Sequence, residues 1–147
     1  MAVTNTGVVL RTITGVHDAN FVHPLGDEEV LNGDFSNGST DWILSGEAEI
    51  TAQGGRIYSS SGGVSSLDQA AVMVVGNKYK LTFDVIATNG AKLSNPNNSN
   101  IYDTSTIGSK VFYITAQYTT LYFKRFGGIT DITIDNISVV EVTEDTD

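Results

Sequence analysis

Residues 80–85 have the sequence KLTFDV, in which apolar and polar side chains alternate strictly. Because successive side chains of a β-strand point to opposite faces, this pattern places Leu81, Phe83 and Val85 on one face and the residues between them on the other. No long stretch of the chain repeats its apolar residues at the three- and four-residue intervals of a helix. The best helix candidate, residues 66–73, predicts one turn at most. The chain is therefore expected to be built from strands.

Further strands are expected on both sides of this stretch, at residues 47–51, 111–115, 120–124 and 131–140. Residues 111–115 are apolar almost throughout, which predicts a central strand covered on both faces. In residues 131–140 the alternation slips by one place after Ile134. This slip predicts a β-bulge at Asp135 and Asn136.

Turn residues separate the expected strands, since the chain holds 15 glycines but only two prolines. Short strands joined by such turns favour an antiparallel β-sandwich of the jelly-roll type, and 147 residues suffice for one domain. We predict an extended N-terminal arm at residues 1–28 and a jelly-roll domain at residues 29–142. Residues 89–109 are predicted to be a polar insertion outside the core, and residues 143–147 an acidic tail.

The charge balance limits the classes of partner. Asp and Glu outnumber Lys and Arg by 17 to 8, for a net charge of −9. Nucleic acids and anionic membranes attract clustered cations, so neither is expected as a partner. The absence of cysteine excludes disulfides and thiolate catalysis. The first residues lack the basic and apolar regions of a signal peptide, so we expect synthesis in a cytoplasm without export.

Three motifs resemble a known family. LNGDF at residues 31–35, followed by Asp41-Trp42, resembles the opening of the family 4 and family 9 carbohydrate-binding modules and their galactose-binding-like relatives. Residues 76–85 (GNKYKLTFDV) are similar to the central strand of those modules, and residues 134–139 (IDNISV) to their closing strand. The residues of all three motifs are also similar to those of the variant that occurs in bacteriophage virion proteins.

The phage resemblance implies a non-enzymatic virion protein that is made in the host cytoplasm. We expect a capsid decoration or head-fibre subunit, bound to capsid or other virion proteins and assembled as a homo-oligomer such as a trimer. The strand-like stretch with Val8, Val9, Leu10 and Ile13 would anchor the arm by pairing with a partner's sheet. The alternatives are a stand-alone carbohydrate-binding module and a tail or baseplate adhesin.

Aromatic side chains are the candidates for glycan contact. Tyr113 and Tyr122 alternate with apolar neighbours, so they point away from the buried face of their strands and could form a shallow platform, with Tyr58 and Tyr102 from loops. Cross-strand packing is the alternative interpretation of these tyrosines. The single tryptophan, Trp42, is expected in the core rather than on such a platform.

Two aspartates are candidates for a metal site. The resemblance implies a structural calcium between the first loop and the last strand, which Asp34 and Asp135 would bind through carboxylate oxygens. Ser36 stands where the family usually has another acidic residue, which weakens this interpretation. The alternative is an Asx turn at Asp34 and stabilisation of the bulge by Asp135. No other cofactor is expected.

No pattern in the chain predicts catalysis. There is no nucleophile elbow of the G-x-S-x-G type. A glycosidase needs two carboxylates across a cleft, whereas Glu47 and Glu49 would share one face of a strand. We therefore expect that the protein is not an enzyme.

Overall fold

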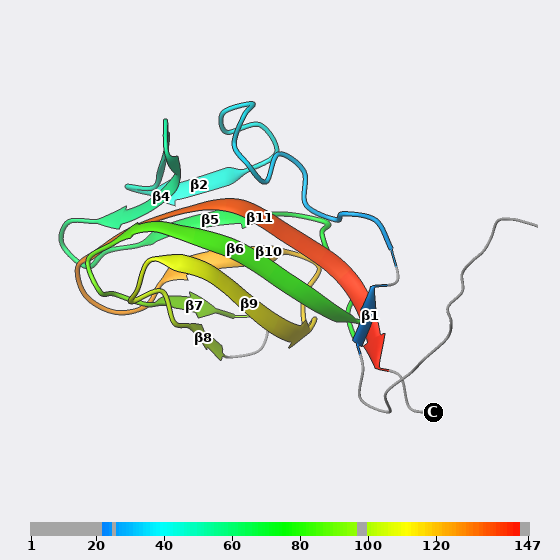
Figure 1. Ribbon diagram of the computed structural model, residues 1–147. Coiled ribbons are helices and arrows are strands. Elements are labelled where there is room, and N and C mark those ends of the chain that lie inside the picture. The colour runs from blue at the N-terminus through cyan, green and yellow to red at the C-terminus, as the bar shows by residue number, and fades with distance from the viewer. Residues whose placement is uncertain (1–21, 25, 97–99, 145–147) are drawn as a thin grey trace, which may run out of the picture.

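The protein is a sandwich of two antiparallel β-sheets (Figure 1). The computed structural model describes residues 22–24, 26–96 and 100–144. The described part of the chain contains strands and turns but no helix. The prediction of an all-β sandwich is therefore confirmed.

The first sheet has six strands, in the order β3-β4-β11-β6-β9, with β1 also paired to β11. Its strands are β1 (Val22–Pro24), β3 (Glu49–Thr51), β4 (Gly54–Ser59), β6 (Lys78–Thr88), β9 (Gly108–Thr115) and β11 (Thr130–Glu144). The second sheet has five strands, in the order β2-β5-β10-β7-β8. Its strands are β2 (Ile43–Gly46), β5 (Ser65–Gln69), β7 (Leu93–Asn95), β8 (Asn100–Tyr102) and β10 (Leu121–Arg125).

The long strand β11 is the axis of the first sheet. One of its edges pairs with β6, and the other pairs with β4 at its start and with β1 at its end. Between β4 and β1 the segment that precedes β2 covers this edge. There the backbone N–H of Ile137 donates to the carbonyl of Gly33, and that of Glu29 donates to the carbonyl of Val139, both at 2.9 Å. The Glu28 carboxylate also accepts from the Val139 N–H at 2.7 Å, so the sandwich begins before residue 29.

The predicted bulge in β11 is confirmed. The register with β6 shifts between Asp135 and Ser138, and Asn136 adopts a left-handed backbone conformation with φ 52°. The closeness of the covering segment explains the glycine of the LNGDF motif: a Cβ at Gly33 would lie 2.2 Å from the carbonyl oxygen of Ile137. Only glycine allows the two backbones to approach so closely.

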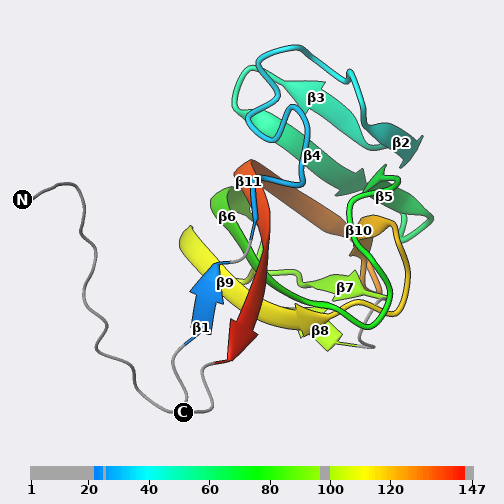
Figure 2. The same cartoon turned by 90° about the vertical axis from the view of Figure 1, so that its right-hand side faces the viewer.

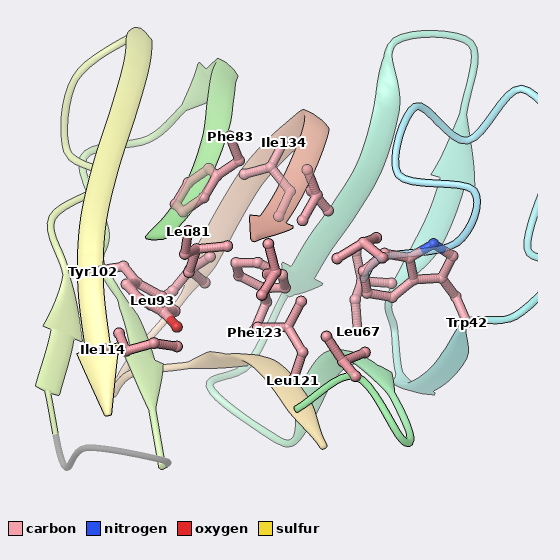
Figure 3. Packing of buried hydrophobic residues seen from close by; sticks show 14 of the residues in the cluster. Trp42, Leu67, Leu81, Phe83, Leu93, Tyr102, Ile114, Leu121, Phe123 and Ile134 are labelled. Atoms are coloured by element: carbon pink, nitrogen blue, oxygen red, sulfur yellow. The ribbon is translucent and has the colours of Figure 1, made fainter. Parts of the chain in front are cut away.

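Alternating residues of both sheets fill the core (Figure 3). Leu81, Phe83 and Val85 are buried as predicted. Phe123 lies at the centre of an aromatic cluster, with ring centroids 5.3 Å from Phe83, 5.5 Å from Tyr102 and 6.4 Å from Trp42. The expectation that Trp42 belongs to the core is confirmed.

Three local predictions are wrong. The segment at residues 66–73 extends as a strand through Gln69 rather than forming a helical turn, because its apolar residues face the core of a sheet. Residues 111–115 belong to β9, an edge strand rather than a central one. Residues 89–109 are not excluded from the core: they supply β7 and β8, and Leu93 and Tyr102 are buried.

Removing the central ring tests this description of the core. Phe123→Ala is expected to lower the free energy of unfolding by about 3–5 kcal/mol, because it deletes a fully buried side chain and leaves a cavity. Tyr122→Ala, on the outer face of the same strand, is the matched control and should cost less than about 1 kcal/mol. Urea unfolding of the three proteins measures the difference, and equal losses would contradict the assignment of faces.

Candidate binding groove around Arg56

The outer face of the six-stranded sheet carries a shallow groove of about 560 Å³. It lies where the β3–β4 turn, β4, the start of β11 and the end of β6 meet. Polar and small side chains line it: Thr51, Ala52, Gln53, Arg56, Ala87, Asp131 and Thr133. Several paired strands therefore build the groove together, and no single continuous segment contains it.

One wall of the groove is the two-residue turn between β3 and β4. The hydroxyl of Thr51 donates to the carbonyl of Gly54 at 3.2 Å and accepts from the Gln53 N–H at 3.2 Å. Gly54 has a φ of 138°, and a Cβ there would lie 2.3 Å from the carbonyl oxygen of Ile134. The Thr51 hydroxyl thus stabilises the turn, and the turn packs closely against β11.

Arg56 is the basic residue among those that line the groove. Its Nε and Nη2 donate to the two oxygens of Asp131, each at 2.9 Å, in a bidentate pair. Its Nη1 donates to Glu49 Oε2 at 2.7 Å. The guanidinium carbon also lies 4.1 Å from the ring centroid of Tyr58. Because β4 lies between β3 and β11, Arg56 reaches one carboxylate on each neighbouring strand.

The electrostatics of the groove follow from this pairing. Hydrogen bonds from Arg56 lower the pKa of Asp131 below its ordinary value. Hydrogen bonds to Asp131 and Glu49 raise the pKa of Arg56 above its ordinary value. Both groups are therefore ionised at neutral pH, and Arg56 is fixed in one orientation.

The arrangement suits binding rather than catalysis. The groove offers planar hydrogen-bonding groups in Arg56, Asp131 and Gln53, and hydroxyls in Thr51 and Thr133. The Arg56–Asp131 pair already satisfies the charged groups, so neither group is poised to transfer a proton. A ligand with several hydroxyl groups fits this set of donors and acceptors.

Of the four predicted tyrosines, only Tyr58 borders this groove, through its contact with Arg56. Tyr102 is only 1% exposed and packs against Phe83, so the prediction that it contacts glycan is wrong. Tyr113 is 57% exposed, but it lies on β9, at the far edge of the same sheet.

Tyr122 lies on β10 of the other sheet, where it contacts Tyr118 and Lys124. The outer faces of the two sheets point in opposite directions. Tyr113 and Tyr122 therefore cannot form the shared platform that their alternation suggests. The local pattern reports the face of a strand correctly but not the sheet to which the strand belongs.

The two predicted calcium ligands lie near each other at the bulge. The Asp34 carboxylate accepts from the Ser36 N–H at 3.0 Å, and that of Asp135 accepts from the Asn136 N–H at 2.9 Å. These bonds confirm the Asx turn and the role of Asp135 in the bulge. Partial burial, followed by the charges of Asp34 and Asp84, raises the pKa of Asp135.

Among the described residues, no group of three or more histidine or acidic side chains has the geometry to hold a metal ion. The calcium assignment remains a prediction from the resemblance. The predicted anchoring residues Val8, Val9, Leu10 and Ile13 lie outside the described residues. The described part of the chain also contains no helix that is long and apolar enough to cross a membrane.

Sequence reasoning missed the Arg56 network. The alternation around Ile57 could have placed Arg56 and Tyr58 on one outer face. Nothing local could have identified Asp131, because it is 75 residues away in the chain. Pairing of β4 with β11 brings the two together.

Comparison with known proteins adds no assignment for the groove. No family model matches the sequence, and no curated protein matches it significantly.

Acid titration tests the Arg56–Asp131 pair. Since Arg56 lowers the folded-state pKa of Asp131 below 3.8, the pair stabilises the protein above that pH. This contribution is lost as the pH falls through the folded-state pKa. Asp131→Asn is expected to cost at most about 1 kcal/mol at pH 7, because the pair is partly exposed.

The deficit of Asp131→Asn relative to wild type should shrink as the pH is lowered from 5 to 2. Thermal unfolding across this range measures the shrinkage. Asp27→Asn, at an exposed aspartate outside the groove, is the matched control. A deficit that does not change with pH would contradict the pairing.

Proposed function

We propose that the protein is a non-enzymatic structural subunit of a bacteriophage virion, in which one end of the sandwich attaches to the shell and the other projects. The family resemblance of its three sequence motifs suggests this class. The structural observation that best supports this proposal is the position of β1. It pairs with the last residues of β11, so the N-terminal segment enters the sandwich where the C-terminal strand leaves it (Figure 2).

This arrangement supports attachment at one end. Val22 pairs with Glu144 and Pro24 with Val142, while Thr130, at the other end of β11, pairs with Ser59 of β4. At ~3.3 Å per residue, the 15 residues of β11 separate the two ends by roughly 45 Å. An arm that precedes β1 would therefore bind a partner far from the groove around Arg56.

Truncation of the arm tests the attachment. Removal of residues 1–21 leaves β1 and the Glu28 hydrogen bonds in place, so the sandwich is expected to keep its stability. Full-length protein should co-sediment with purified shells of candidate phages, and the truncated protein should not. Ile129→Ser, at an exposed residue at the opposite end, is the control and should still bind.

Light scattering measures the molar mass of the full-length and truncated proteins in solution. It therefore shows whether the arm is also needed for self-association. Failure of the full-length chain to bind any shell, with the fold intact by circular dichroism, would overturn the virion proposal.

A second candidate function is carbohydrate binding in the groove around Arg56, either as an added activity of the virion subunit or as that of a stand-alone module. The observation that favours it is the set of fixed planar groups beside Tyr58. Arg56 is locked by two carboxylates, so it meets a sugar without losing further rotamer freedom. Hydroxyl pairs of a pyranose can accept from and donate to such groups.

Glycan arrays followed by calorimetry test this candidate. Gln53→Ala, in an exposed turn, removes an amide without touching the core and should weaken binding about tenfold. Arg56→Gln should weaken it further. Tyr113→Ala, on the far edge of the same sheet, should leave affinity unchanged. Loss of binding in the Tyr113 variant but not in the Gln53 variant would place the site on β9 instead.

A further inference from the structure

Strand β9 forms one edge of the six-stranded sheet, and no described strand pairs with its outer side (Figure 1). It runs for eight residues, roughly 27 Å at ~3.4 Å per residue. The edge strands β2, β3 and β8 have only three or four residues each. Proteins usually keep exposed edges short or interrupt them with proline, because an open strand can pair with another chain. Strand β9 is long and contains no proline, so it is the edge best suited to such pairing.

The backbone groups that face the open side of β9 follow from its hydrogen bonds with β6. Ala116, just after β9, donates its N–H to the Asn77 carbonyl at 3.0 Å, and its own carbonyl accepts from the Gly76 N–H at 2.8 Å. Both groups of Ala116 thus face β6. The register between β6 and β9 has no shift, and successive residues of a strand turn their N–H and C=O groups to opposite sides. Val111 and Tyr113 therefore point their backbone groups away from β6.

The other side of β6 gives the same assignment. The N–H and carbonyl of Val139 bond to the segment before β2, so they face away from β6. Val139 pairs with Leu81, whose backbone groups must then face β9, where Leu81 pairs with Phe112. The groups of Phe112 are therefore used within the sheet, and those of its two neighbours in β9 are left at the open edge.

The same two neighbours expose apolar side chains. Val111 is 53% exposed and Tyr113 is 57% exposed, both on the outer face of the sheet. Phe112 faces the core, where its ring centroid lies 5.8 Å from that of Phe83 and 4.9 Å from that of Tyr102. The edge thus combines backbone hydrogen-bonding groups with apolar surface beside them. Strand addition uses this combination, since backbone bonds provide affinity and side-chain pairs provide register.

Charges beside the edge favour a second copy of this chain in antiparallel orientation. Lys78 and Lys80 of β6 lie next to the end of β9. Asp84 lies next to its start, where it accepts from the Ser109 hydroxyl at 2.7 Å. A two-fold axis places the acidic end of one copy against the basic end of the other, whereas a parallel arrangement would align like charges. The opposite charges are three strand spacings apart, roughly 14 Å at ~4.8 Å each, so they set orientation more than affinity.

We infer that two copies of the chain pair through their β9 strands, so that their six-stranded sheets become one continuous sheet. The alignment that matches the apolar side chains has Phe112 on the two-fold axis. Val111 of each copy then lies opposite Tyr113 of the other, and such pairs of aromatic and β-branched residues stabilise sheets. Pairing at β9 uses neither the N-terminal arm nor the groove around Arg56.

Lys110 is the one charged residue of β9, and it does not block this pairing. Its Nζ donates to Thr106 Oγ1 at 2.8 Å, so the side chain turns back along its own chain. With Phe112 on the axis, Lys110 lies opposite Ile114 of the second copy. The two lysines are therefore not placed opposite each other, which would be destabilising.

Sedimentation velocity of the full chain tests the pairing. Wild type should shift from monomer towards dimer as its concentration rises to about 1 mM. Val111→Pro should weaken the dimer at least about tenfold, because it removes an N–H that faces the open edge and makes no bond within the sheet. Val111→Lys should also weaken it, and it keeps the test valid if the proline variant does not fold. Val64→Lys makes the same change at another exposed valine, before β5, and should leave the dimer unchanged.

Single cysteines test the alignment, because the wild-type chain has none. Residues opposite each other in hydrogen-bonded pairs have Cα atoms ~5.5 Å apart, which a disulfide can span. A mixture of the Val111→Cys and Tyr113→Cys proteins should therefore form linked dimers under mild oxidation, faster than either protein alone. Val64→Cys is the control and should link slowly.

Two outcomes would overturn the inference. The first is a wild-type chain that remains monomeric up to about 1 mM. The second is an oligomer that both Val111 variants leave intact, together with cross-linking of the mixture no faster than that of Val64→Cys. That result would mean that the copies meet through another surface, such as the N-terminal arm.

Discussion

The structure depends on the pairing of β11 along both of its edges. Over its 15 residues this strand pairs with β6 on one side, and on the other with β4, the segment before β2 and β1 in turn. Three of the five other strands of the first sheet therefore pair directly with this one strand. The bulge at Asn136 occurs where the covering segment crosses, and Gly33 permits the close backbone contact there. The motifs LNGDF and IDNISV, about a hundred residues apart, are two halves of this single contact.

The same strand separates the functions that we propose. The end of β11 pairs with β1 (Figure 1). Its start contributes Asp131 to the groove. Attachment and recognition would thus occupy opposite ends of the sandwich, and a ligand at one end would not compete with a shell at the other.

The candidate site differs from the one that the sequence suggests. The sequence suggests aromatic residues as glycan contacts. In the structure, however, Tyr102 belongs to the core, and Tyr122 lies on the other sheet and faces away from the groove. The groove depends instead on an arginine between two carboxylates, Glu49 and Asp131, contributed by flanking strands. Polar residues with distant partners give no periodic signal, so they are difficult to find before the strand order is known.

By itself the sequence determined the class of fold, the buried face of residues 80–85 and the bulge in the last strand. These are local properties, because the alternation of side chains along a strand follows from backbone geometry alone. Only the tertiary structure decided that β9 is an edge strand, that residues 89–109 contribute to the core and that Arg56 meets Asp131. Those facts depend on which strands pair and in what order. Pairing is settled by how two whole sheets bury their apolar faces together, a property of contacts between residues far apart in the chain.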